Sequence, residues 1–110
     1  MDKSACISAL GALAHETRLD VFRSLVKAGQ SGLLPGEISQ DLGVLQNTLS
    51  THLAILHRAG LVTSRREGRT IRYMADMDGM RSCLGYLMED CCGGQPELCR
   101  PILTQLACAC

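Results

Sequence analysis

Three cysteines near the carboxyl end of the sequence stand close enough together to bind a single ion. Cys91, Cys92 and Cys99 belong to the segment CCGGQPELC, in which two glycines free the backbone and a proline helps to turn it. Thiolate sulfur is the ligand type that soft ions prefer. Arsenite and antimonite are trivalent centres whose lone pair leaves a pyramid of three sulfurs. The spacing therefore predicts a three-thiol site for As(III) or Sb(III).

The other four cysteines form two groups with different expectations. The sequence has seven cysteines, an odd number that excludes a complete set of intramolecular disulfides. Cys6 and Cys83 fall in apolar helical segments, where a cysteine is usually a small buried hydrophobe. Three interpretations stay open for Cys108 and Cys110: a second ion site, a relay that passes the ion to the first site, or a frayed chain end. Because no signal peptide or membrane-spanning stretch is visible, we expect a reduced, cytoplasmic protein with no membrane partner.

Other chemistry competes for the tail thiols. Zinc prefers four ligands and often recruits histidine, but His15, His52 and His57 all lie in the first 57 residues, far from the tail. Cadmium, lead and zinc therefore rank behind arsenite and antimonite. A thiol-based redox or persulfide sensor is also open, with Cys92 and Cys99 as the two reacting thiols.

The elements that must position these thiols follow from the periodicity of the apolar residues. Helical spacing and terminating glycines predict helices over residues 5–14, 16–28, 35–42 and 46–59. A last main helix is predicted over residues 77–90. Residues 98–106 add one or two helical turns beyond it.

A basic hairpin is predicted between the helices. Residues 61–66 and 70–75 favour strands, and Gly68 marks the turn between them. The 11 basic residues balance the 11 acidic ones over the whole chain, which excludes a histone-like polybasic protein. Residues 58–72 nevertheless hold five arginines against one glutamate. Such an arginine cluster suits contact with phosphate groups.

Helix, turn, helix and basic hairpin, in this order, predict a winged helix-turn-helix: a mainly α fold with a β-hairpin wing (α+β). In the helix that begins near residue 46, short polar side chains share a face away from the leucines. Such side chains reach base edges in the major groove, although a polar helix face is more often simply solvated. The candidate DNA contacts are Gln46, Asn47, Ser50 and Thr51 on the helix and Arg65, Arg66, Arg69 and Arg72 on the hairpin.

About residues 7–90 resemble the arsenic-responsive (ArsR-type) repressor family of winged-helix proteins. The most specific segments are HETR from His15, STHL from Ser50 and AGLV from Ala59, which leads into the wing. The resemblance implies a homodimer formed through the first and last helices, binding to double-stranded operator DNA, and release by an inducer. It also implies that Thr48 and His52 lie on the recognition helix.

The thiol segment resembles family members that carry a C-terminal Cys-Cys…Cys site. It does not resemble members with cysteines on the DNA-reading helices, because this sequence has none there. The inducer is therefore expected to act from the dimer and tail side. The family often places a Ser or Thr cap where this sequence has Leu45, so we expect another group to satisfy the start of the recognition helix.

These expectations amount to one domain over residues 1–110, in which residues 77–110 form the last helix and a cysteine-rich sensing tail. The expected function is metalloid-responsive transcriptional repression. An enzyme is not expected, because the sequence has no Cys-x-x-Cys motif, phosphate-cradling loop or βαβ pattern.

Overall fold

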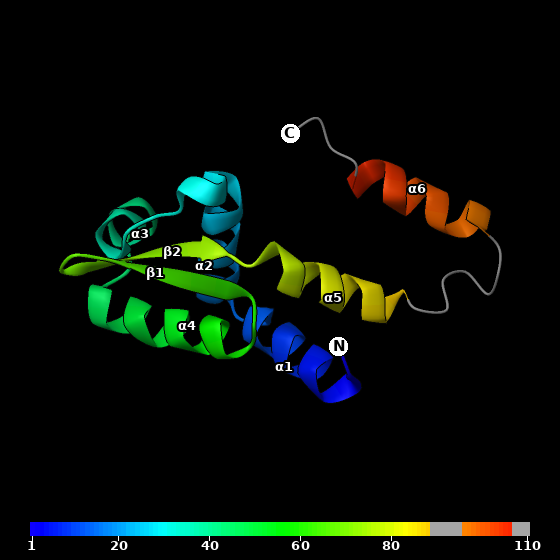
Figure 1. Ribbon diagram of the computed structural model, residues 1–110, viewed down its shortest axis with the longest axis horizontal. Helices are drawn as coiled ribbons and strands as arrows, with labels where there is room; N and C mark the ends of the chain where they lie inside the picture. Colours follow the sequence, from blue (N-terminus) through cyan, green and yellow to red (C-terminus); the bar gives the residue numbers. More distant parts are fainter. Residues whose placement is uncertain (89–95, 107–110) are drawn as a thin grey trace.

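A computed structural model of the protein describes residues 1–88 and 96–106 (Figure 1). Its elements, in chain order, are α1 (Lys3–Leu13), α2 (Glu16–Ala28), the 3-10 helix η1 (Gly29–Ser31), α3 (Pro35–Leu42), α4 (Gln46–Arg58), β1 (Val62–Glu67), β2 (Thr70–Ala75), α5 (Met77–Leu87) and α6 (Pro96–Leu106). This order confirms the predicted winged helix-turn-helix, with α3 and α4 as the helix pair and β1–β2 as the wing. Among the described helices, none has the length and apolar character needed to cross a membrane.

Side-chain caps explain where two of the helices begin. The Asp2 carboxylate accepts a hydrogen bond from the backbone N–H of Ala5 at 2.8 Å, and the Asp76 carboxylate accepts one from Gly79 at 3.0 Å. Each bond satisfies an N–H that the first helical turn leaves free. Gly79 also lies against the carbonyl oxygen of Gly60, where a Cβ would collide with the backbone. The lack of a side chain there lets α5 start directly at the end of the wing.

The wing is an antiparallel hairpin whose strands are joined by a two-residue turn after Glu67, which pairs with Thr70. Gly68 in this turn has a φ of 62°, in the left-handed region that glycine adopts readily. Leu33 forms a bridge to Tyr73 through two backbone hydrogen bonds of 2.9 Å. This bridge ties the loop before α3 to the wing and so fixes the wing against the helix-turn-helix.

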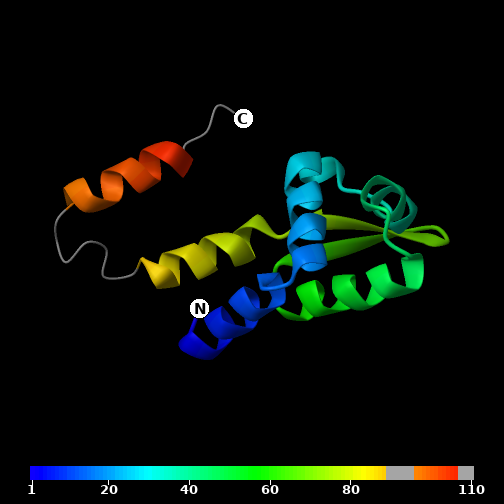
Figure 2. The ribbon, with the colours of Figure 1, turned by 180° about the vertical axis from the view of Figure 1, so that it is seen from behind.

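The core lies where α2, α4 and the wing meet, with α1 and α5 packed against one another at one side (Figures 1 and 2). Aliphatic side chains, two cysteines and one aromatic residue fill it, because the whole sequence has only one Phe, two Tyr and no Trp. The buried apolar residues are Cys6, Ala9, Ala12, Val21, Phe22, Leu25, Ile38, Leu49, Leu53, Leu56, Leu61, Val62 and Cys83.

Two boundaries predicted for the end of the chain are wrong. The helix predicted over 77–90 is α5, which ends at Leu87. The one or two turns predicted over 98–106 are instead an 11-residue helix, α6, which begins at Pro96 and contains Pro101. Proline suits a first helical position, because its missing N–H has no partner there in any helix. α6 lies beyond α5 and apart from the other helices in both views (Figures 1 and 2).

Candidate nucleic-acid interface

The exposed face of α4 carries the polar side chains that the sequence assigned to DNA. Leu49, Leu53 and Leu56 are buried along the opposite face and anchor α4 in the core. The sequence-predicted residues that are exposed on α4 are Gln46, Asn47, Thr48, Ser50 and Thr51. The helix therefore has the two faces that docking and base reading require.

Two of these polar side chains already make hydrogen bonds within the helix. Leu45 precedes α4 without a side-chain cap, as predicted. The Asn47 side-chain oxygen instead accepts from the backbone N–H of Thr48 at 2.9 Å, which satisfies one free donor of the first turn. The Ser50 hydroxyl donates to the carbonyl of Gln46 at 3.1 Å. The side chains of Gln46 and Thr51 make no such bond within the described residues.

Glu67 divides the wing arginines into two groups. Its carboxylate accepts from Arg65 at 2.9 Å and from Arg72 at 3.0 Å. Hydrogen bonds from Arg72 and then Arg65 lower the pKa of Glu67 below its ordinary value. Arg72, whose side chain is only 25% exposed, also donates to the carbonyl of Ser31 at 3.1 Å. Arg72 thus ties the wing to η1, so part of its role is structural.

Arg66 and Arg69 form the second group, and both are exposed. In the part of the chain that the structure describes, neither makes a side-chain hydrogen bond or ion pair. Alternation along a strand places Arg66 on the same face of the hairpin as Ser64. Ser64 lines a groove against α4, so Arg66 shares the face that looks toward the recognition helix. Among the described residues, no acceptor therefore holds either of these two guanidinium groups.

The groove between α4 and the wing has a volume of about 270 Å³ and contains two residues that sequence reasoning did not select. His57 and Arg58 are exposed at the end of α4 and line this groove together with Ser50 and Tyr73. The signal for Arg58 was present, because it begins the arginine-rich segment. The polar face of α4 alone does not indicate Arg58, because its place in the groove depends on the packing of the wing against α4.

His52 occupies a different place from the other recognition-helix candidates. It is only 9% exposed, its ring lies 4.8 Å from that of His15, and its Nδ1 has no hydrogen-bond partner in the described structure. His15 caps α2, because its Nδ1 accepts from the backbone N–H of Thr17 at 3.1 Å. Burial first, and then the charges of His15 and Arg18, lower the pKa of His52. His52 therefore does not share the exposed face of α4 on which the other candidate DNA contacts lie.

Acid should destabilise the fold through His52. Its pKa is lowered in the folded state, so the unfolded chain binds the proton first as the pH drops through about 6.5. The free energy of unfolding should be undiminished at pH 7.5 and should fall by up to about 1.4 kcal/mol per pH unit below 6.5, until folded His52 itself protonates. Urea unfolding at pH 7.5, 6.5 and 5.5 measures this slope.

Two histidine variants assign that slope to a residue. His52→Leu should remove the slope, whereas His57→Gln, at an exposed position of the same helix, should retain it. The Glu67 carboxylate titrates below its ordinary value of 4.5 and does not contribute in this pH range. An equal slope in His52→Leu and in the wild type would place the titration elsewhere.

The predicted thiol ligands lie mostly outside the described residues. Cys91 and Cys92 lie in the segment 89–95, and Cys99 is placed only as a backbone position in α6. Cys6 and Cys83 are described: both are buried, as predicted, and their sulfurs are 3.9 Å apart. Within the described residues, no three His, Cys, Asp or Glu side chains gather into a metal-binding group.

Comparison with known proteins places these features in a family. Residues 13–65 match the model of a helix-turn-helix domain. The putative arsenical resistance operon repressor ArsR of Halobacterium salinarum is 40% identical over 75 residues, which cover 68% of this chain and 57% of that protein. Across the similar curated regulators, the aligned part spans between 52 and 72% of their own length.

Two solved structures share the fold over most of the chain. HlyU from Vibrio cholerae is 33% identical, with a TM-score of 0.65, and the match covers 84% of this chain and 99% of HlyU. An ArsR-like transcriptional regulator from Rhodococcus has a TM-score of 0.71 at 25% identity, with 97% and 96% of the two chains covered. The helix order, the wing and these relatives agree, and the chain belongs to the ArsR family of winged helix-turn-helix transcriptional regulators.

Proposed function

We propose that the protein is a homodimeric repressor that binds operator DNA and is released when arsenite or antimonite binds Cys91, Cys92 and Cys99. The observation that carries the DNA-binding part is an exposed polar face on α4 beside Arg66 and Arg69 of the wing, which make no side-chain hydrogen bond or ion pair within the described residues. The metalloid part rests on the spacing of the three tail cysteines and on the likeness to a putative arsenical resistance repressor.

DNA contact divides between the helix and the wing. The exposed face of α4 enters the major groove, where Gln and Asn make bidentate bonds to adenine and the hydroxyls reach bases or phosphates. Arg66 and Arg69 bind phosphates or the adjoining minor groove. Arg65 and Arg72 support this arrangement by pairing with Glu67, and Arg72 also ties the wing to η1.

A second copy of the chain is the partner that we assign to α1 and α5. These helices pack together and leave large apolar side chains exposed. They include Ile7 and Leu10 on α1 and Leu84 and Leu87 on α5, each between 40 and 60% exposed. A two-fold dimer buries the same patch on both subunits and presents two α4 helices to two half-sites of an operator.

Inducer binding is a condensation of three thiols with arsenous acid. Three S–H groups and As(OH)3 give three As–S bonds and three waters, without any change in oxidation state. Cys91 lies four residues after the end of α5, α5 packs on α1, and α1 packs on α4. A change at the tail thus has a continuous path of packed helices to the recognition helix. Release requires the inducer to bind the off-DNA state more tightly than the DNA-bound state.

Removing Arg66 and Arg69 from the wing should weaken DNA binding and reduce its dependence on salt. The logarithm of the DNA-binding constant falls linearly with the logarithm of the salt concentration, and each arginine that neutralises one phosphate makes this slope steeper by about 0.9. Each arginine occurs twice in a dimer. The double variant Arg66→Ala/Arg69→Ala should therefore make the slope shallower by about 4. Fluorescence anisotropy with a labelled operator fragment at several salt concentrations measures it.

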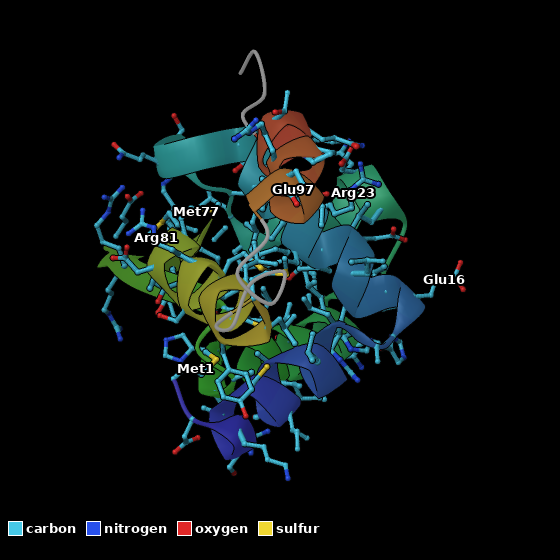
Figure 3. The ribbon with its side chains drawn as sticks, turned by 90° about the vertical axis from the view of Figure 1, so that its right-hand side faces the viewer. Met1, Glu16, Arg23, Met77, Arg81 and Glu97 are labelled. Carbon is cyan, nitrogen blue, oxygen red and sulfur yellow. The ribbon has the colours of Figure 1, made fainter. Side chains whose placement is uncertain are left out.

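The matched control is Arg23→Ala, because Arg23 is exposed and projects outward from α2 rather than from the wing or α4 (Figure 3). This control should keep the wild-type slope. If the double variant also keeps the wild-type slope, the wing does not bind phosphate as proposed.

A further inference from the structure

Cys6 and Cys83 form a pair of thiols that neither DNA binding nor the tail site uses. Cys6 lies on α1 and Cys83 lies on α5, 77 residues apart in the sequence. Their sulfurs are 3.9 Å apart, in direct contact, and the two residues are 2% and 1% exposed. We propose that Cys6 and Cys83 are a redox site, at which hydrogen peroxide forms a disulfide that joins α1 to α5 within one subunit.

The geometry favours a bond between these two sulfurs over any other product. A disulfide has a sulfur–sulfur distance of about 2.05 Å, so the sulfurs must approach by roughly 1.9 Å. Such an approach requires rotations about the two Cα–Cβ bonds and a small shift of α1. The disulfide is uncharged, and it therefore suits the apolar surroundings, where a lasting thiolate or sulfinate would be costly.

The reaction balances with one peroxide per thiol pair. One sulfur loses its proton and, as a thiolate, attacks a peroxide oxygen; the O–O bond breaks and a sulfenic acid remains. The departing hydroxide takes up the proton that the thiol released and becomes the first water. The second sulfur then attacks the sulfenic sulfur, the S–O bond breaks, and the departing hydroxide takes a proton to form a second water. The two sulfurs together lose two electrons, and peroxide is reduced to two waters.

Access to the pair depends on the weak attachment of α1. The buried residues of α1 are Cys6, Ala9 and Ala12, which are all small, so the helix buries little apolar surface. Local opening of such an element costs less than global unfolding. Burial, and then the hydrogen bond with Cys6, raise the pKa of Cys83, so its thiolate is scarce in the closed state. The pair therefore reacts slowly and records sustained oxidation rather than a brief pulse.

The test uses the full-length chain with the five tail cysteines replaced by serine, so that only Cys6 and Cys83 remain. Trypsin then releases residues 4–18, which contain Cys6, and a peptide that begins at Ser82 and contains Cys83. After peroxide treatment of the folded protein and alkylation of free thiols, we expect these peptides to be linked, with a mass two hydrogens below their sum. The same chain with Cys6→Ala should give no link.

A second readout checks that the link forms within a folded subunit. Closing a chain segment of this length restricts the unfolded state, so the urea midpoint of the oxidised protein should rise. It should return on reduction and should not move in the Cys6→Ala control. Circular dichroism before oxidation shows whether each variant is folded. Three results would each overturn the proposal. They are Cys6 and Cys83 still free and alkylated after prolonged oxidation, a sulfinic acid in place of the link, and a link between two subunits.

Discussion

Arsenite should release the wild-type protein from an operator fragment under reducing conditions, while Cys91→Ser, Cys92→Ser and Cys99→Ser should each stay bound. The physical reason is that a pyramidal As(III) centre needs three sulfur ligands. A serine hydroxyl at any one position leaves two thiolates and a much weaker site. Allosteric coupling free energies are typically about 1–3 kcal/mol, so arsenite should lower the wild-type DNA affinity by about 5- to 150-fold.

The measurement is DNA binding by fluorescence anisotropy over a range of arsenite concentrations. The operator is a fragment selected from random DNA by the reduced protein itself. A phosphine reductant keeps the thiols reduced, because dithiol reductants bind arsenite themselves. The matched control is Cys108→Ser, which removes a tail thiol outside the proposed site and should respond like the wild type.

The outcomes separate the proposed function from its alternatives. Release by zinc, cadmium or lead but not by arsenite would assign the tail to a different ion. Release by an oxidant alone would assign it to thiol redox sensing. Release of Cys99→Ser at wild-type arsenite concentrations would remove Cys99 from the site.

The sequence predicted the helix-turn-helix and the wing because their signals are local. α2 and α3 have the predicted bounds, and α4 begins at the predicted Gln46, since glycines and a first-turn proline mark these boundaries. The predicted hairpin is confirmed with its turn at Gly68. In contrast, α6 is longer than the one or two turns predicted over 98–106, and it contains Pro101, a residue type that usually interrupts a helix.

Side-chain partners that are distant in the sequence could not be predicted in this way. The contact of Arg72 with the Ser31 carbonyl joins residues 41 apart, and that of Cys6 with Cys83 joins residues 77 apart. Both depend on how the elements pack in three dimensions. His52 illustrates the same limit, because helical periodicity gives the side of α4 on which a residue lies but not what covers it. The structure shows that the ring of His15 lies beside it.

Gln46→Ala should cause the largest loss of DNA affinity among single changes on α4. Gln46 is exposed at the start of the helix, and its side chain makes no hydrogen bond within the described residues. A bidentate contact between Gln and adenine contributes about 1–3 kcal/mol, and a homodimer makes it twice. The free energy of binding to the selected operator should therefore weaken by about 2–6 kcal/mol, which is a loss of affinity of roughly 30-fold to 10⁴-fold.

The fold should tolerate this change. The Gln46 carbonyl, which accepts from Ser50, belongs to the backbone and remains in the variant. Alanine also has the highest helix propensity. The urea midpoint should therefore stay close to that of the wild type. Gln30→Ala, an identical substitution at an exposed position of η1, should change neither stability nor DNA affinity.

The salt dependence distinguishes this loss from that of the wing variant. A base contact releases no counterions, so Gln46→Ala should lower the affinity at every salt concentration while the slope stays that of the wild type. Its discrimination between the operator and single-base variants should also weaken at one position in each half-site. If the variant instead lowers the slope and treats all base variants as the wild type does, then Gln46 contacts phosphate, and sequence reading belongs to other residues of α4.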